Sequence, residues 1–284
     1  MQLRLATFEQ VKTNNLITRL ITGVLLVSII VGNTMFGPMS FILLFYLINV
    51  TGLFEFYRLF RGSNYNIAKI PGYTFSTVLF LISAMSLVDL LSWSSALFLL
   101  PLVLLTYIYE LYRKNPEPFV SVSLTLFGVI YITVPVICIL AIPFISTENN
   151  YYSSEFLLLY FSLIWVFDSS AYVFGKKFGR KKLFVRISPN KTWEGFLSAS
   201  LIVILLGFFY NFQFAQQKIN WIIVSMIIIC FGTFGDLVKS MLKRSRHVKD
   251  SGSIFPGHGG VLDRFDSMFG SAPVVLIYLL KFCR

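Results

Sequence analysis

Long apolar runs alternate with short polar segments along almost the whole chain. A helix needs about 20 mostly apolar residues to cross the roughly 30 Å hydrocarbon core of a bilayer. Nine runs approach that length, which predicts nine transmembrane helices at about residues 17–35, 39–57, 72–91, 93–112, 119–143, 154–175, 194–213, 219–238 and 268–282. The third and fourth runs are separated only by a short turn near Ser92, and the ninth is short and contains Pro273.

The composition supports a membrane protein. Only 13% of the 284 residues are charged and 56% are hydrophobic, with a mean hydropathy of +0.74, whereas ordinary soluble domains carry about 25% charged residues. We predict one all-α polytopic domain over residues 1–284, with N-terminal transmembrane helices in 1–160 and, in 161–284, the helices and cytoplasmic loops that hold nearly all the candidates for chemistry. The three cysteines lack the paired spacings of a disulfide framework or zinc site.

The basic residues predict an orientation, since loops rich in Lys and Arg stay cytoplasmic. With nine spans and a cytoplasmic N-terminus, 21 of the 24 basic residues fall on the cytoplasmic side. No small-residue cleavage site follows the first apolar run, so we expect a retained span rather than a signal peptide. Most of the net charge of +11 then lies on the cytoplasmic face, where it would be attracted to anionic lipids of the bilayer. We expect no nucleic-acid partner.

Two carboxylates fall inside predicted spans. Asp168 follows one apolar run and Asp236 another. An ionised group at that depth costs several kcal/mol unless a partner or a water-filled cavity meets it, which indicates a functional site. At helical spacing Asp168 shares a face with Ala171, Tyr172 and Gly175. Helix packing alone would account for the small residues, but it does not account for Asp168.

The helix after Asp236 carries a polar stripe. Helical spacing places six residues on one face: Asp236, Lys239, Ser240, Lys243, Arg244 and His247. The alternative is a helix that extends its basic side chains to the interface without further function. The residues that follow this helix favour a functional stripe.

A glycine-rich turn comes next, with the sequence PGHGG at residues 256–260. Consecutive backbone N–H groups in such a turn can bind an anion such as phosphate. The run does not fit GxxxxGK followed by Ser or Thr, so a P-loop is excluded. Asp263, Asp266 and Ser267 follow at helical spacing and, with Asp236, supply the hard oxygen ligands that Mg²⁺ prefers. His258 could stabilise the turn, contact phosphate or act as an acid.

These residues carry a family resemblance. The run SMLKRSRHVKDSGSIFPGHGGVLDRFD, at residues 240–266, resembles the signature of phosphatidate cytidylyltransferases, also called CDP-diacylglycerol synthases. DSSAYVFG at 168–175 and SPNKTWEG at 188–195 are similar to the same family, although Asn190 stands where a second lysine is expected. The resemblance covers about residues 165–270; in the N-terminal part only Glu55 adds a weaker point of similarity.

The resemblance implies a multi-span homodimer that transfers a cytidylyl group from CTP to phosphatidic acid, releases pyrophosphate and requires Mg²⁺. It leaves open whether a monovalent cation also participates. Asp236 and Asp263 are the implied metal ligands, with Asp266 and Asp250 as further candidates. The other implied catalytic residues are Lys243, Arg244, Lys249, His258 and Arg264. The implied substrate-binding residues are Asp168, Tyr172, Ser188, Lys191, Glu194, Lys239, Ser240, Gly257, Gly259 and Gly260.

Two of these assignments keep alternatives. Asp168 either completes the ion site or orients Lys243 or Lys239. The basic loop at 176–193 closes over CTP or recruits the anionic lipid, and its Ser188-Pro189 could equally be a turn before Thr192 as the N-cap of the next helix.

The substrates predict where the site lies. Acyl chains stay in hydrocarbon and a nucleotide stays in water, so we expect a cavity open to both on the cytoplasmic side of a bacterial inner membrane. Other classes fit less well. A secondary transporter would need polar groups along both halves, a CDP-alcohol transferase would need a DGxxAR run that is missing from the sequence, and a CTP-dependent lipid kinase is chemically close.

Overall fold

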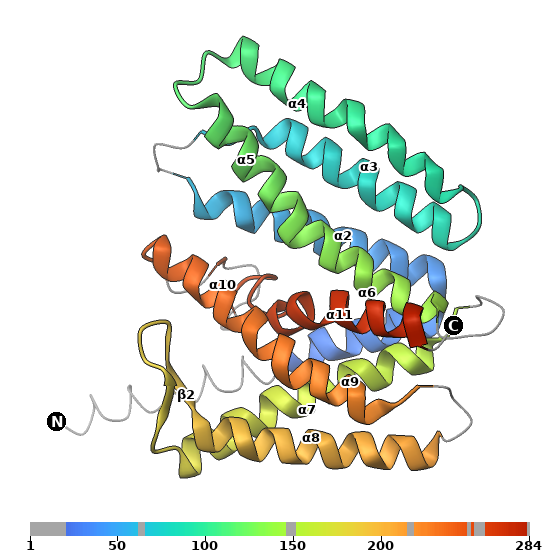
Figure 1. Cartoon of the computed structure of the whole chain (residues 1–284), viewed down its shortest axis with the longest axis vertical. Coiled ribbons are helices and arrows are strands. Elements are labelled where there is room, and N and C mark those ends of the chain that lie inside the picture. Colours follow the sequence, from blue (N-terminus) through green and yellow to red (C-terminus); the bar gives the residue numbers. More distant parts are fainter. Residues whose placement is uncertain are drawn as a thin grey trace.

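The computed structural model describes residues 21–61, 66–145, 152–214, 219–248, 251–252 and 259–282. Most of them are helical (Figure 1). The α-helices are α2 (Pro38–Leu59), α3 (Lys69–Leu87), α4 (Leu99–Arg113), α5 (Pro118–Gly128), α6 (Val134–Ile145), α7 (Ser154–Phe178), α8 (Trp193–Gln213), α9 (Trp221–Ile227), α10 (Thr233–Ser245) and α11 (Asp266–Phe282). A further apolar helix covers Ile21–Phe36.

Short elements join some of these helices. A 3₁₀ turn, η1 (Trp93–Phe98), leads into α4, and two π-helical turns, η2 (Val129–Thr133) and η3 (Ile228–Gly232), connect α5 to α6 and α9 to α10 without a break. The strands β1 (Lys182–Phe184) and β2 (Ser188–Thr192) form an antiparallel hairpin between α7 and α8.

Seven helices are long and apolar enough to cross a bilayer: Pro38–Leu59, Lys69–Leu87, Ser94–Arg113, Pro118–Phe144, Ser154–Phe178, Trp193–Gln213 and Trp221–Ser245. The predicted all-α membrane protein is therefore confirmed, and seven of the nine predicted spans have a counterpart of full length. The described part of the first span is a shorter apolar helix, and α11, with 17 residues, also falls short of that length. The first and ninth spans stay predictions.

Several loops with basic residues lie on the same side of the bundle. In Figure 1 the C-terminal ends of α2, α4 and α10 and the β1–β2 hairpin are all at the left, whereas α11 ends at the right. Arg58 and Arg113 lie in the last turns of α2 and α4, and Lys243 and Arg244 in the last turn of α10. These basic ends therefore share one side of the bundle, and that this side faces the cytoplasm stays a prediction.

The two halves of the chain pack around a shared core. The ring of Phe45 on α2 lies 6.4 Å from that of Phe161 on α7 and 6.2 Å from that of Phe265, just before α11. All three side chains are buried. α11 contacts α6 on one side and the α9–η3–α10 helix on the other, and Figure 1 shows it between them. The N-terminal half thus supports the elements that carry the polar motifs.

Candidate active site

Three aspartate carboxylates converge on the ammonium group of Lys239. Asp236 lies on α10 with Lys239, Asp263 lies in the turn before α11, and Asp266 is the first residue of α11. Nζ of Lys239 is 3.2 Å from Oδ1 of Asp263 and 3.6 Å from Oδ1 of Asp236, and it also contacts Oδ2 of Asp266. Lys239 is only 5% exposed. Because a buried charge needs partners, this cation holds together acids from two separate elements.

Two further lysines complete the cluster. Nζ of Lys243 lies 2.7 Å from Oδ1 of Asp263, and Nζ of Lys191, on β2, lies 2.5 Å from Oδ2 of Asp236. Burial disfavours ionisation of Asp263, but attraction to Lys239 and the hydrogen bond from Lys243 outweigh it and hold the pKa of Asp263 well below its ordinary value. Three carboxylates and three ammonium groups therefore form one polar cluster at the end of apolar helices.

A close helix crossing brings the acids together. Gly235 and Gly270 lie where α10 meets α11, and a side chain at either position would overlap the opposite helix. Glycine is the residue that permits such an approach of two backbones. Asp236 and Asp266 lie beside this crossing, so their carboxylates reach the same ammonium group.

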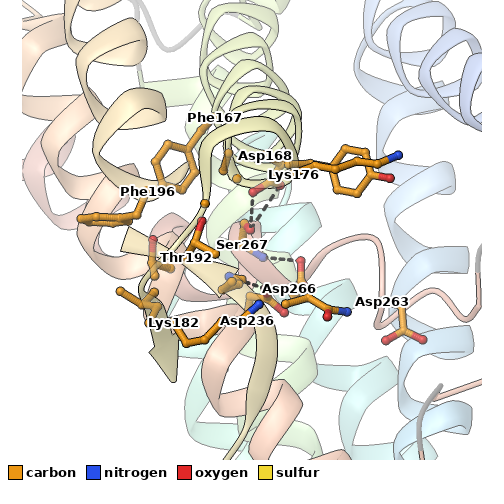
Figure 2. Close-up of a pocket in the computed structure, with 18 of the residues that line it drawn as sticks. Phe167, Asp168, Lys176, Lys182, Thr192, Phe196, Asp236, Asp263, Asp266 and Ser267 are labelled. Atoms are coloured by element: carbon orange, nitrogen blue, oxygen red, sulfur yellow. Dashed lines mark hydrogen bonds and ion pairs between the residues drawn. The ribbon is translucent and has the colours of Figure 1, made fainter. Parts of the chain in front are cut away.

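Asp168 joins the cluster from α7. Both of its carboxylate oxygens lie 3.3 Å from Oγ of Ser267, and the backbone N–H of Ser267 donates to Oδ1 of Asp266 at 2.8 Å. Figure 2 shows Asp168 directed at Ser267, with dashed lines between their side chains. Ser267 therefore connects the carboxylate of Asp168 on α7 to that of Asp266 on α11.

Four members of the cluster, the three carboxylates and Lys191, line a partly open cavity of about 590 Å³. Such a volume is within the range of small-molecule sites. One part of the wall is apolar, with Phe167, Tyr172 and Phe196, and another is charged (Figure 2). The charged part comes from Asp168, Lys176, Lys182, Lys191, Asp236, Asp263, Arg264 and Asp266. One cavity thus offers both an apolar and a strongly polar surface.

Hydrogen bonds connect the β1–β2 hairpin to the start of α8. Thr192 is the N-cap of α8, accepting a hydrogen bond from the backbone N–H of Gly195 at 3.3 Å, which confirms its predicted capping role. The carboxylate of Glu194 accepts hydrogen bonds from the backbone N–H groups of Arg180 (2.9 Å) and Lys181 (3.0 Å). The hairpin is fixed at its base, which holds Lys191 over Asp236.

The donor set suits a cation. Oxygens of three carboxylates surround one point, where an ammonium group now stands, and hard oxygen ligands are those that Mg²⁺ takes in proteins. Within the described residues, no three Asp, Glu, His or Cys side chains are arranged to hold a metal by themselves. A divalent ion here would therefore be held by one or two carboxylates, with phosphate and water oxygens as its other ligands.

Comparison with known proteins identifies the family of the chain. The sequence model of the cytidylyltransferase family matches residues 17–282. The chain belongs to this family. It is 34% identical over 268 residues to the phosphatidate cytidylyltransferase of Bacillus subtilis (strain 168), covering 93% of this chain and 97% of that protein. The enzyme of the same name from Staphylococcus haemolyticus is 33% identical over 276 residues, covering 93% and 98% of the two chains.

A third relative matches a shorter region. The phosphatidate cytidylyltransferase of Rickettsia felis is 42% identical over 163 residues, or 55% of this chain and 70% of that protein. Membership of the cytidylyltransferase family thus rests on matches over most of the chain, well beyond the motifs of residues 165–270.

The structure brings together many of the residues predicted from the family signature. Asp236, Lys239 and Lys243 share one face of α10, as the stripe predicted, and Ser240 Oγ lies 3.4 Å from Oδ1 of Asp236. Tyr172 and Arg264 line the cavity. Their roles in binding or catalysis stay predictions.

Other predicted residues lie differently. α10 ends at Ser245, and His247 has a left-handed backbone (φ 56°), so the predicted stripe is wrong in extending to His247. Arg244 Nε lies 3.4 Å from the carbonyl oxygen of Ile187 in the hairpin, and Ser188 pairs with Phe184 in the β-ladder. Glu194 binds backbone amides, as described above. Lys249, Asp250, Gly257 and His258 lie outside the described residues.

Gly259 and Gly260 pack against protein carboxylates. The N–H of Gly260 donates to Oδ2 of Asp263 at 3.2 Å, and a Cβ at Gly260 would overlap the carboxylate of Glu55. Glu55 and Ser251 both reach the segment that carries Asp263, and neither was predicted at the site. The sequence signals for Glu55 were a carboxylate near the end of an apolar run and a weak point of family similarity.

Proposed function

We propose that this protein transfers the cytidylyl group of CTP to phosphatidic acid, giving CDP-diacylglycerol and pyrophosphate for phospholipid synthesis. The observation that carries the proposal is the cluster of three carboxylates and three lysines beside a cavity with an apolar wall, in a chain of the cytidylyltransferase family. Its relatives of similar length bear the name of this enzyme.

The reaction joins two anions. A phosphate oxygen of phosphatidic acid attacks the α-phosphorus of CTP, a new P–O bond forms, and the bond to the departing pyrophosphate breaks. A phosphate monoester has a second pKa of about 6, so the nucleophile is largely dianionic at neutral pH and needs no general base. The main barrier is electrostatic repulsion, which only positive charge can reduce.

The lysines and Arg264 supply this positive charge. Lys191 lines the cavity and pairs with Asp236, so it is in place to contact incoming phosphate oxygens. Lys243 pairs with Asp263, whose carboxylate lines the cavity. Arg264 is exposed and lines the same cavity. Lys239 is enclosed by the three acids, so its role here is to keep their carboxylates together rather than to bind phosphate directly.

We further propose Mg²⁺ as the cofactor, held by the two carboxylates of Asp236 and Asp263, with Asp266 and Asp250 as further candidates in place of one of them. When bound, it would neutralise charge on the phosphates and stabilise the charge that develops at the transferring phosphorus. The convergence of these carboxylates on one cation supports this assignment. The described residues give no separate support for a monovalent ion.

The location follows from the same chemistry. We propose that the protein resides in a bacterial inner membrane with the cavity facing the cytoplasm, where CTP is available. The common side of the basic loops supports this orientation. A homodimer is proposed on the family resemblance alone, and cross-linking of the protein in lipid nanodiscs would test it.

The activity test uses purified full-length protein in mixed micelles with phosphatidic acid, labelled CTP and Mg²⁺. A CDP-lipid and pyrophosphate should form in equal amounts. Diacylglycerol replaces phosphatidic acid in a second reaction: a phosphorylated lipid and CDP as products would instead indicate a CTP-dependent lipid kinase. Failure to produce a CDP-lipid, with protein that is folded and monodisperse, would overturn the proposed function.

A further inference from the structure

Glu55 is a fully buried carboxylate on α2, in the half of the chain that lacks the family motifs. Its Oε1 accepts a hydrogen bond from the backbone N–H of Val261 at 2.9 Å, and its Oε2 accepts one from that of Leu262 at 3.0 Å. Both donors lie immediately before Asp263. Glu55 therefore binds the backbone of the segment that presents a candidate metal ligand.

The backbone of this segment explains why a carboxylate is needed. The N–H of Asp263 donates to the carbonyl oxygen of Gly260 and that of Arg264 to the carbonyl oxygen of Val261, which forms one tight turn. The N–H groups of Val261 and Leu262 lie at the start of the turn, where donors point away from the turn as they do at a helix N-terminus. A carboxylate that accepts both is a strong partner for them.

Glycines allow Glu55 to approach this closely. A Cβ at Gly252 or at Gly260 would overlap its carboxylate. Gly259, with φ +82°, has a left-handed backbone, and a Cβ there would lie 2.7 Å from Oδ2 of Asp263. The described glycines of this segment therefore leave room for two protein carboxylates, one of which comes from α2.

Ser251 links the two carboxylates. Its hydroxyl lies 3.2 Å from Oε2 of Glu55 and 2.9 Å from Oδ2 of Asp263, so one proton is shared between them. The N–H groups of Ser251 (3.0 Å) and Gly260 (3.2 Å) also donate to Oδ2 of Asp263. This oxygen is fully engaged by the segment, which leaves Oδ1 to face Lys239 and Lys243.

We propose that Glu55 is a positioning residue for nucleotidyl transfer, acting through the 260–264 turn and Ser251 to orient the Asp263 carboxylate toward the cavity. Glu55 is not among the residues that line the cavity, so it would act through Asp263 and not on a substrate. The inference rests on the proposed function, because orientation of Asp263 matters only if Asp263 serves the reaction.

The test compares Glu55→Gln and Ser251→Ala with a matched control, Glu110→Gln. Glu110 is also buried in the N-terminal half. Its carboxylate accepts hydrogen bonds from Arg113 on α4 at 2.6 Å and from Ser121 on α5 at 2.5 Å. The control therefore removes the same charge from a similar environment without touching the 260–264 turn. In Glu55→Gln, an NH₂ group replaces one of the two acceptors of the turn.

Two quantities are measured on each purified protein: kcat with saturating substrates, and the rise in melting temperature on adding CTP with Mg²⁺. Glu55→Gln and Ser251→Ala should each lower kcat by about 10- to 100-fold, the usual cost of losing a group that orients a metal ligand. Both should also reduce the ligand-induced rise in melting temperature. The double variant should lose much less than the product of the two single losses, because both changes break one connection. Glu110→Gln should keep kcat and the ligand-induced rise.

The outcomes separate the two proposals. A wild-type protein with no activity and no response to CTP would overturn the proposed function. The positioning role alone would be overturned if the wild type is active and both Glu55→Gln and Ser251→Ala keep its kcat and its ligand-induced rise in melting temperature, even if they melt at lower temperature. Should Glu55→Gln not fold, Ser251→Ala decides, because it leaves both backbone hydrogen bonds of Glu55 in place.

Discussion

Gly235 on α10 and Gly270 on α11 are in direct backbone contact. A Cβ added at Gly270 would lie 2.8 Å from Cα of Gly235, and one added at Gly235 would lie 2.6 Å from the carbonyl oxygen of Asp266. Either side chain would push the two helices apart. Since Asp236 and Asp266 lie next to this contact, it determines how close their carboxylates come.

Gly270→Ala should therefore impair both stability and activity. Overpacking of a tight contact costs about 1–3 kcal/mol, and separation of α10 from α11 would pull Asp266 away from Lys239 and Asp236. Thermal unfolding in detergent and the CDP-lipid assay measure the two effects. The control is Gly32→Ala, a helical position with no atom within 4 Å of an added Cβ, which should be neutral or slightly stabilising. Full activity of Gly270→Ala would contradict the argument.

Asp263→Asn should reduce kcat by at least about 100-fold, because the transition state loses a carboxylate that holds positive charge against the phosphates. The fold should persist, since an amide can keep part of the hydrogen bonding to Ser251. Asp89→Asn is the control: Asp89 is exposed with φ 57°, a conformation that Asn tolerates well. Normal turnover by Asp263→Asn, measured as pyrophosphate release, would show that Asp263 is not a metal ligand.

Much of the fold could be predicted because a bilayer requires each transmembrane helix to be an apolar run of a minimum length, and such runs are visible in the sequence. The helices of full length fall where apolar runs of the required length lie. Side-chain spacing also placed Asp236, Lys239 and Lys243 on one face, since α10 is a regular helix from Thr233 to Ser245. The local motifs were sufficient for these features because each depends on residues close in sequence.

Contacts between distant segments could not be predicted in the same way. The sequence predicted Lys239 as a substrate-binding residue, but it did not predict that three acids surround its ammonium group. Lys191 reaches Asp236 only because the hairpin folds back over α10. Glu55 reaches Val261 and Leu262 from a helix about two hundred residues earlier. No spacing rule relates such positions, because the connection exists only in the packed bundle.

Lys191→Met should raise KM for CTP or lower kcat by about tenfold or more, which corresponds to the roughly 1.5–3 kcal/mol of a hydrogen bond between charged groups. Without Lys191, less positive charge would offset the negative charge of the Asp236 carboxylate, which would then repel the triphosphate more strongly. Lys177→Met serves as the control, because Lys177 is exposed on α7 and its ammonium lies over the ring of Phe178. Equal kinetics for the two variants would exclude Lys191 from the site.

The pH dependence of stability reports on Asp263. Its pKa is lowered in the folded protein, so the ionised carboxylate stabilises the fold fully above the ordinary Asp pKa of about 3.9, and this contribution is lost as the pH falls below that value. The difference in melting temperature between wild type and Asp263→Asn should stay constant from about pH 8 to about pH 5 and shrink below about pH 4. A difference that already shrinks between about pH 7 and about pH 6 would mean that this pKa is raised.

Lys239→Met should destabilise the protein strongly, because it leaves three carboxylates around a point with no cation. Removal of one partner from a buried ionic cluster typically costs about 3–5 kcal/mol. If the same carboxylates bind Mg²⁺, millimolar Mg²⁺ should restore much of the lost melting temperature, whereas NaCl at equal ionic strength should not. Lys69→Met, at the exposed start of α3, should respond to neither salt beyond the wild-type effect. A Lys239→Met protein that stays destabilised at every Mg²⁺ concentration would argue that the cluster is an ion-paired support rather than a metal site.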